Sequence, residues 1–168
     1  CGIMLLLLRP FKVGDVIQVS GILGTVYEIE LFNVKLNAPD NRRVILPNSS
    51  VFGSTIENFT HNPTRRVDVS VGVAYAADIA KTREVLLKAV RSVPGLLAEP
   101  AADVVLLELG ASSVNWRVSG WAEPANFLAI KQAITEACKR SLDDSDIEIP
   151  FPQMDVWLRN SQQGVNAD

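Results

Sequence analysis

The sequence has few of the residues that build enzyme active sites and metal sites. It contains a single histidine, His61, and two cysteines, Cys1 and Cys138, at opposite ends. Cysteines so far apart form no metal-ligand or redox spacing, so we expect free thiols and a reducing compartment. No stretch resembles a phosphate-binding glycine loop, a zinc site or a nucleophile elbow. The sequence therefore predicts no enzyme, no cofactor and no metal ion.

Charge of one sign is not in excess either. Lysine and arginine number 16 and aspartate and glutamate 19, for a net charge of −3, and aromatic residues make up only 7%. Nucleic-acid binders need a strong cationic excess or an aromatic stacking platform, and the chain shows neither. Two cationic pairs, Arg42 with Arg43 and Arg65 with Arg66, could contact RNA or line an anion-favouring passage. A solvated role is favoured for both, and we expect no nucleic-acid partner.

Two other polar groups are weak site candidates. His61 lies in a polar stretch with a proline, which favours a solvated or capping role over catalysis. Asp143, Asp144 and Asp146 could hold a hard cation. No glycine turn and no following bidentate glutamate complete such a loop, so a solvated loop is the better interpretation.

A hydrophobic run of membrane-spanning length is also missing. Residues 3–8 are all apolar, and the run ends at Arg9 and Pro10 because proline disfavours helix at the residue before it. A spanning helix needs about twenty such residues. No basic region precedes the run and no cleavage site follows it, so it is not a signal peptide. Two interpretations stay open: a short helix of a soluble domain, or the last turns of a membrane helix with Arg9 and Lys12 at the headgroups.

The rest of the composition is that of a globular protein. Hydrophobic residues are 48% and charged residues 21% of the 168 residues, which argues against disorder and allows one domain or two small ones. The polar, proline-containing break at residues 61–64 is the best candidate for a domain boundary.

Residues 11–62 have the pattern of a small β-domain. Alternating apolar residues predict five short strands separated by turn signals, with a turn at Gly21, a bulge or bend at Gly24 and a tight turn at Pro39 to Asn41. So many short strands in so little chain are typical of an SH3-like or Sm-like barrel. The expected strands are 16–20, 23–31, 33–38, 42–46 and 55–60.

Residues 63–152 alternate strands with helices. We expect strands at 67–73, 104–109 and 113–121, a last strand at Ile147 to Ile149, and helices from Asp78 to about residue 93 and from about Pro124 to Leu142. Ile79, Leu86, Val90 and Val93 are predicted to share the buried face of the first helix. Phe127, Ile130, Ile134, Ala137 and Cys138 are predicted to form the buried stripe of the second. This order predicts a ferredoxin-like α/β domain, and an α+β chain as a whole.

One more strand is expected behind the prolines of residues 150–152. Met154, Val156 and Leu158 lie on one side of the segment 153–160. A lone strand has to pair with something, and copies of itself in a symmetric oligomer are one answer. The polar residues 161–168 are expected to form a flexible tail.

Short motifs spread along the chain resemble those of small-conductance mechanosensitive channels, the MscS-like family. The resemblance runs in register from about Gly2 to Leu158, and the shared order of the motifs makes it specific. The motifs are Arg9, Pro10 and Phe11 with Gly14 and Asp15; Gly21 to Val26; Ile45 to Asn48; Ile56 to Phe59; Gly72 to Tyr75; Leu109 to Ser113; and Pro150 to Val156.

The resemblance implies a membrane-tension-gated ion channel that releases ions and small osmolytes on hypo-osmotic shock. Residues 1–10 would end the pore-lining transmembrane helix, and the rest would form the cytoplasmic vestibule of a homoheptamer in the inner membrane. Arg9, Pro10, Phe11 and Lys12 would lie at the lipid interface. Gly2, Asn48 and Ser49 would support the pore helix. Met154, Val156 and Leu158 would enter an intersubunit barrel.

The chain departs from the family pattern at two places. Ser49 stands where many relatives carry glycine, and Ala76 and Ala77 stand where relatives are often more acidic. The alternative function is a soluble Sm-like and ferredoxin-like module that binds RNA or a small metabolite. The near-neutral charge argues against RNA.

Overall fold

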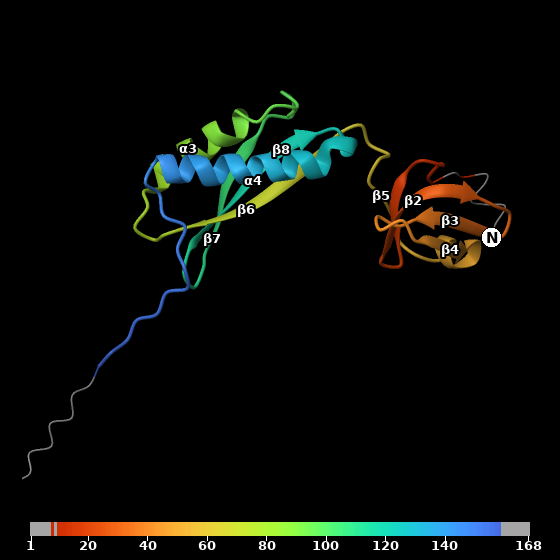
Figure 1. Ribbon diagram of the computed structural model, residues 1–168, viewed down its shortest axis with the longest axis horizontal. Coiled ribbons are helices and arrows are strands. Elements are labelled where there is room, and N and C mark those ends of the chain that lie inside the picture. The colour runs from red at the N-terminus through yellow and green to blue at the C-terminus, as the bar shows by residue number, and fades with distance from the viewer. Residues whose placement is uncertain (1–7, 9, 159–168) are drawn as a thin grey trace, which may run out of the picture.

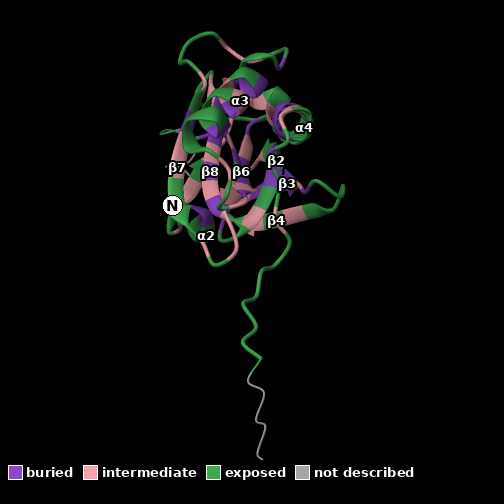
Figure 2. Cartoon of the chain, turned by 90° about the vertical axis from the view of Figure 1, so that its left-hand side faces the viewer, coloured by how far each residue is buried: buried purple, intermediate pink, exposed green. Residues whose placement is uncertain are grey.

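The chain folds into two lobes, each with its own hydrophobic core. The computed structural model describes Leu8 and residues 10–158. Figure 1 shows a small β-domain at one end and a larger α/β domain at the other, joined by the segment that follows β5. Each lobe encloses its own cluster of buried apolar residues. Figure 2 marks the buried positions of the chain in purple. The predicted α+β fold class, a small barrel-like sheet followed by a ferredoxin-like domain, is confirmed.

The β-domain is a five-stranded antiparallel sheet in the order β4-β3-β2-β1-β5. All five expected strands form, with ends shifted or trimmed. A short helix, α2 (Asn48–Phe52), follows β4 and was not expected from the sequence. The strands are β1 (Val16–Val19), β2 (Ile22–Ile29), β3 (Asn33–Asn37), β4 (Arg43–Pro47) and β5 (Ile56–Asn58).

The β1–β2 hairpin turns where the sequence predicts. Val19 pairs with Ile22, and the two residues between them, Ser20 and Gly21, have positive φ of 51° and 78°. Positive φ at both central residues is the mark of a two-residue hairpin turn whose twist matches its strands. Glycine adopts this geometry without strain, so the predicted turn at Gly21 is confirmed.

The bulge predicted at Gly24 was misplaced. The register of β2 against β3 shifts between Val26 and Glu28 instead. Gly24 serves a different purpose, since a Cβ atom there would lie 2.9 Å from the backbone oxygen of Asn37 and 3.0 Å from Cβ of Leu36. The glycine therefore lets β3 approach closely. In the sequence alone, an isolated glycine within a strand indicates a bulge and a close approach equally well.

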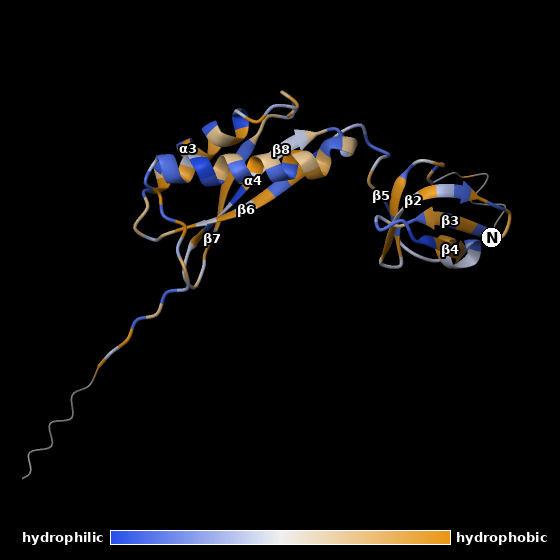
Figure 3. Cartoon of the chain, in the orientation of Figure 1, coloured by the Kyte–Doolittle hydropathy of each residue, from blue (hydrophilic) through white to orange (hydrophobic). Residues whose placement is uncertain are grey.

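The β-domain core draws on every part of the sheet and on the segment before it. Alternating apolar residues along β1, β2 and β3 point inward, and Val51 of α2 closes the core. Figure 3 shows hydrophobic and hydrophilic stretches along the strands of this domain. The fully enclosed side chains are Phe11, Ile17, Val19, Val26, Val34, Leu36 and Val51.

The α/β domain is a three-stranded antiparallel sheet in the order β6-β8-β7, with two helices packed on one face. Trp116 on the central strand is fully buried between the sheet and the helices. The elements are β6 (Arg65–Val73), α3 (Ile79–Arg91), β7 (Asp103–Leu109), β8 (Val114–Ala122), the 3-10 turn η1 (Pro124–Asn126) and α4 (Phe127–Asp144).

Helix α3 begins as expected. The Asp78 carboxylate accepts a hydrogen bond of 2.7 Å from the backbone N–H of Lys81 and caps the helix. Leu86, Val90 and Val93 are buried, but Ile79 is 51% exposed, so its predicted place on the buried face was wrong. The first residue of a helix lies beside the cap, and here it lies off the stripe that contacts the sheet.

The buried stripe of α4 follows the predicted spacing. Ile130, Ile134, Cys138 and Leu142 are buried against the sheet. Phe127 and Ala137 are only half-buried and pack at the edge of the same core. The amphipathic period thus positions the helix correctly.

The fourth strand expected at Ile147 to Ile149 does not form. Ile147 is buried in the core, but Ile149 is 41% exposed. A single backbone hydrogen bond, from Ala74 N–H to the Glu148 oxygen at 2.9 Å, joins this segment to the end of β6. Pro150 has no N–H to extend a ladder. The Ile147 N–H also donates to the Leu142 oxygen at 2.9 Å, at the end of α4. The segment is therefore held by one buried side chain and two backbone hydrogen bonds, and the sheet of the described chain keeps three strands.

The C-terminal segment leaves the α/β domain without pairing. Residues 153–158 are exposed and in no regular secondary structure, and Figure 1 shows them running away from the domain. The backbone N–H of Gln153 donates to Oγ of Ser112 at 3.1 Å, which fixes where the segment departs. Pairing of Met154, Val156 and Leu158 with other subunits remains a prediction.

Candidate functional site

The candidate site is the entry segment, residues 10–15, which leads into β1. Its centre is Asp15, whose side chain is only 5% exposed. The carboxylate accepts three hydrogen bonds: from the Lys12 backbone N–H at 3.0 Å, from Asn58 Nδ2 at 2.9 Å and from Thr60 Oγ1 at 3.2 Å. A buried carboxylate satisfied in this way holds the entry segment against the end of β5.

Asn58 connects the entry segment to the linker that leaves the β-domain. Its Nδ2 donates to the Asp15 carboxylate and also lies 3.4 Å from the backbone oxygen of Pro10. Its Oδ1 accepts the backbone N–H groups of Thr60 at 3.1 Å and His61 at 3.0 Å. One side chain therefore joins the chain segments that enter and leave this domain.

These hydrogen bonds control the charge of Asp15. Burial alone would raise its pKa. The hydrogen bonds from Asn58, the Lys12 backbone and Thr60, together with the positive charge of Lys12, outweigh burial and hold the pKa of Asp15 below its ordinary value of 3.8. The group is therefore ionised at neutral pH, where it accepts hydrogen bonds most strongly.

The residues predicted to lie at a membrane interface differ in their exposure. Pro10 and Lys12 are exposed. Phe11 is 3% exposed and packs in the β-domain core with Ile17 and Val19. A lipid-facing role for the Phe11 side chain is therefore wrong, because the ring is already buried among aliphatic side chains. Arg9 lies outside the described residues.

Asn48, predicted to support the pore helix, is a buried polar anchor. Its backbone N–H donates to the Phe32 oxygen at 2.9 Å, and its Nδ2 donates to the oxygens of Glu30 and Leu31, each at 2.9 Å. These bonds fix the β2–β3 turn against the start of α2. Asn48 is 2% exposed, while Ser49 is exposed and Gly2 lies outside the described residues.

The turn held by Asn48 presents apolar side chains to the outside, which the sequence patterns did not reveal. Leu31 is 50% exposed and Phe32 is 79% exposed. Large exposed apolar groups beside a rigid buried anchor are a common feature of surfaces that pack against another element. The signal that could have found them is the pair of apolar residues that breaks the alternation at the end of β2.

The C-terminal segment is the most exposed apolar stretch of the described chain. Met154 is 84% exposed, Val156 69%, Trp157 90% and Leu158 90%. The predicted intersubunit residues Met154, Val156 and Leu158 are thus accessible. Trp157 adds a large apolar group on the other side of the segment.

The arginine pairs each find local partners. Arg42 pairs with Asp40, with 2.6 Å between Nε and Oδ2, and Arg43 stacks on Tyr27 with its guanidinium carbon 3.7 Å from the ring centroid. Arg66 pairs with Asp68 at 2.9 Å, while Arg65 lies between two phenylalanine rings. Each of the four arginines thus has a contact within the chain.

The remaining polar candidates show no site. His61 is exposed in the linker, and Asp143 pairs with Lys139. Within the described residues no group of histidine, cysteine and acidic side chains is placed to hold a metal ion. No helix described in the structure has the length and apolar character needed to cross a bilayer.

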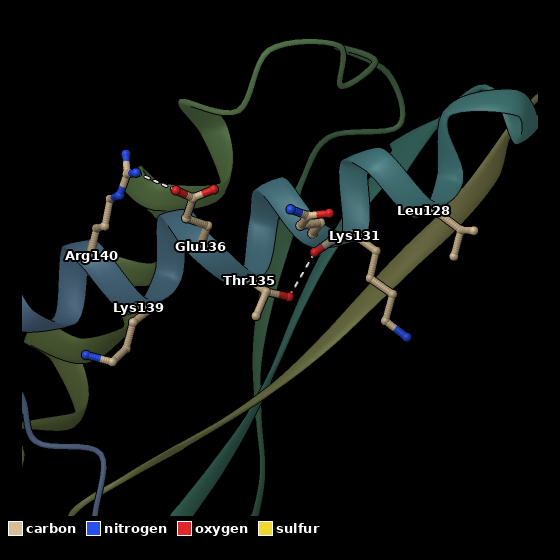
Figure 4. Close-up of a pocket in the computed structure, with 7 residues that line it drawn as sticks. Leu128, Lys131, Thr135, Glu136, Lys139 and Arg140 are labelled. Carbon is tan, nitrogen blue, oxygen red and sulfur yellow. Dashed lines mark hydrogen bonds and ion pairs between the residues drawn. The ribbon is translucent and has the colours of Figure 1, made fainter.

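A shallow groove follows the outer face of α4 (Figure 4). Its volume is about 650 Å³, and Leu128, 77% exposed, is its apolar side chain. Several polar side chains along the groove already have partners. Arg140 pairs with Glu136, and the hydroxyl of Thr135 donates to the Lys131 oxygen at 2.8 Å. The groove lies on the α/β domain, apart from the entry segment.

Family profiles match both domains in order. Residues 1–61 match the β-domain of mechanosensitive ion channels, and residues 67–149 match the C-terminal domain of the mechanosensitive ion channel MscS. The two profiles together define the class, a β-domain followed by the C-terminal domain of mechanosensitive channels. The chain belongs to the MscS-like family of small-conductance mechanosensitive channels. This is a family of channels, a non-enzymatic class.

The curated relatives match over nearly the whole chain. The small-conductance mechanosensitive channel of Edwardsiella ictaluri is 41% identical over 157 residues, covering 94% of this chain and 55% of the relative. An MscS family protein of Synechocystis is also 41% identical, with 53% of its length covered. The chain therefore spans about half the length of the curated relatives that it matches.

Solved structures share the fold. The crystal structure of Helicobacter pylori MscS in its closed state matches with a TM-score of 0.90 at 32% identity, over 95% of this chain and 64% of that chain. The cryo-EM structure of Arabidopsis thaliana MSL1 matches with a TM-score of 0.74 at 18% identity, over 89% of this chain and 56% of that one. The second likeness concerns the fold alone.

Proposed function

We propose that this chain forms the cytoplasmic vestibule and the end of the pore helix of a membrane-tension-gated channel. The channel would release ions and small osmolytes after a sudden drop in external osmolarity. The observation that carries the proposal is the match of both domains, in order and over 95% of the chain, to a solved closed-state MscS structure. The family profiles of the β-domain and of the C-terminal domain of mechanosensitive channels support the same proposal.

The entry segment would transmit force between the membrane and the β-domain. Lys12 is exposed, as required of a cation that contacts lipid headgroups, and Arg9 and Pro10 would lie beside it. The three hydrogen bonds to Asp15 and the burial of Phe11 attach this segment rigidly to the β-domain. A rigid attachment lets a displacement of the helix end move the whole domain.

Asn48 and Ser49 would support the bent end of the pore helix. The Nδ2 group of Asn48 donates to two carbonyl oxygens of the β2–β3 turn, so the turn cannot shift without breaking these bonds. Leu31 and Phe32, exposed on that turn, would offer the apolar surface on which the helix rests. Gly2 would permit close packing of the helix itself.

The C-terminal segment would assemble the subunits. Met154, Val156 and Leu158 are highly exposed, and such apolar surface is stable in water when other chains cover it. Strands contributed by each subunit, heptameric as in the family, would close a parallel barrel with no free edge. The anchor of Gln153 on Ser112 would set the point at which the strand leaves the domain.

Gating follows from a shift between two populations. Tension favours whichever state has the larger in-plane area, and the difference in lipid contact between the two states shifts the equilibrium between them. The described residues contribute the rigid part of this device, since the buried polar anchors at Asp15 and Asn48 hold the elements below the pore in place.

The test of the channel function uses the complete gene, including the segment upstream of Cys1. Expressed in a bacterium that lacks its own tension-gated channels, it should restore survival after osmotic downshock. A Lys131→Ala variant, altered at an exposed site on α4, serves as a control and should protect equally. Well-expressed protein in the membrane that gives no protection would sink the proposal.

The assembly is tested separately. Native mass spectrometry of the chain should find a ring of subunits, and deletion of residues 153–158 should reduce its size. Deletion of residues 161–168 is the matched control and should leave the ring unchanged. A stable monomer at high concentration, or a ring unaffected by loss of 153–158, would count against the proposed role of this segment.

A further inference from the structure

Arg65 is placed between two aromatic rings that belong to different domains. Its guanidinium carbon lies 4.4 Å from the centroid of Phe59 and 3.7 Å from the centroid of Phe127. Both distances are within the range at which a cation is attracted to the face of a ring. All three side chains are half-buried, so part of the surrounding water is excluded.

The two rings are fixed to their own domains. Phe59 continues the β1–β5 pairing, since its backbone N–H donates to the Val16 oxygen at 2.9 Å. Phe127 is the first residue of α4 and packs against the α/β core. Arg65 is the first residue of β6 and pairs with Ala122 across the sheet. The stack therefore bridges the linker, residues 60–64.

Other bonds between the domains are scarce. In the part of the chain that the structure describes, no hydrogen bond or ion pair connects residues 10–61 with residues 65–158. The polar groups of the linker are bound to the β-domain instead, through Asn58 and Asp15. The two hydrophobic cores share no residue, so the guanidinium stack is the contact that joins the two domains among these described interactions.

We infer that Arg65 is a conformational latch that holds the α/β domain in one orientation against the β-domain. Arginine suits this position because its flat, weakly hydrated guanidinium stacks well on aromatic rings. A lysine ammonium is compact and strongly hydrated and cannot stack on two rings in this way. The latch does not depend on the proposed channel function, because it concerns two domains of one chain.

The test measures the distance between the domains directly. Spin labels are attached at Thr55→Cys in the β-domain and Lys88→Cys on α3, both exposed positions. The background is Cys1→Ser, and Cys138 is left in place because it is buried. Labelled chains are diluted with unlabelled chains so that only distances within one chain are recorded by pulsed dipolar spectroscopy.

Arg65→Gln should raise the fraction of molecules outside the main distance peak on the order of tenfold. Arg65→Lys should have an intermediate effect. Arg66→Gln is the matched control, because it removes the same charge from the next residue, whose partner Asp68 lies in the same domain; it should leave the distribution unchanged.

Phe127→Leu keeps apolar volume but removes one ring face and should act like Arg65→Gln. Circular dichroism checks that both variants are folded, and Phe59→Leu replaces any variant that is not. The latch is rejected if Arg65→Gln and the leucine variant both keep the wild-type distribution. It is also rejected if Arg66→Gln broadens the distribution as much as Arg65→Gln does.

Discussion

The side-chain amide of Asn58 donates a hydrogen bond of 2.9 Å to Oδ2 of Asp15, although 43 residues separate them. Through this bond the segment that enters the β-domain touches the segment that leaves it. The Asn58 side chain therefore links the entry segment to the linker directly. Since Asp15 is 5% exposed, water has little access to the carboxylate and cannot easily take the place of this hydrogen bond.

Asp15→Ala should lower the free energy of unfolding of the β-domain by about 2–3 kcal/mol, because three partly buried donors lose their charged acceptor. Hydrogen exchange of the amides of β1 and β2 measures the change in this domain alone. Asp40→Ala is the control, since Asp40 is exposed and pairs with Arg42 at the surface, where solvent screens the pair and its contribution to stability is small. Equal effects of the two substitutions would contradict the role of Asp15.

The same carboxylate makes stability depend on pH in a defined direction. The pKa of Asp15 in the folded protein lies below its ordinary value of 3.8. Its stabilising contribution is therefore complete above the ordinary value and is lost as pH falls from there through the lowered folded pKa. The difference in unfolding free energy between wild type and Asp15→Asn should shrink as acid titration passes below pH 3.8. A difference that grows in acid would show that the sign is wrong.

Asn48→Ala should destabilise the β-domain by about 1–3 kcal/mol. The substitution removes the donor shared by the carbonyls of Glu30 and Leu31, and buried carbonyls without a partner are costly. Chemical denaturation followed by circular dichroism provides the measurement. Ser49→Ala, at the exposed neighbour, should change stability by no more than about 0.5 kcal/mol. An Asn48 variant as stable as the Ser49 control would remove the basis for a buried anchor here.

Much of the fold follows from local sequence signals. Turn residues such as Gly21 and the cap Asp78 lie where their backbone chemistry requires them, and the period of α4 predicts its buried stripe. Such features are encoded within a few residues. This is why the strands of the β-domain and both long helices were predicted with small errors at their ends.

Long-range contacts were not predictable in the same way. The bond between Asp15 and Asn58 depends on β5 pairing with β1, and no local pattern reports it. Phe11 next to a cationic residue fits a membrane interface equally well until the core around it is known. The strand prediction at Ile147 was wrong for a related reason. Alternating apolar residues occur in paired strands, but also in segments that are held by one buried side chain, as here.

The thiol of Cys138 should react only slowly in the folded protein. It is 2% exposed on α4, and burial raises its pKa from 9.0 to about 11, so little thiolate exists near neutral pH. In a Cys1→Ser background, a thiol-reactive dye at pH 8 should label the native chain far more slowly than the chain in denaturant. Rapid labelling of native protein would show that α4 opens often, contrary to its packing.

Gly24→Ala should destabilise the β-domain although alanine normally suits a strand better than glycine. The added methyl group would lie 2.9 Å from the Asn37 backbone oxygen and 3.0 Å from Cβ of Leu36, so β2 and β3 must separate. Overpacking of this kind costs about 1–3 kcal/mol. The measurement is the denaturation midpoint at constant slope. Gly53→Ala is the comparison. Gly53 has a negative φ of −81°, and the atom nearest to an added Cβ would be the Ser49 oxygen at 3.3 Å. The Gly53 substitution should therefore destabilise the domain less. If Gly24→Ala raises stability instead, the glycine is a conformational weak point of the strand and not a close-approach position.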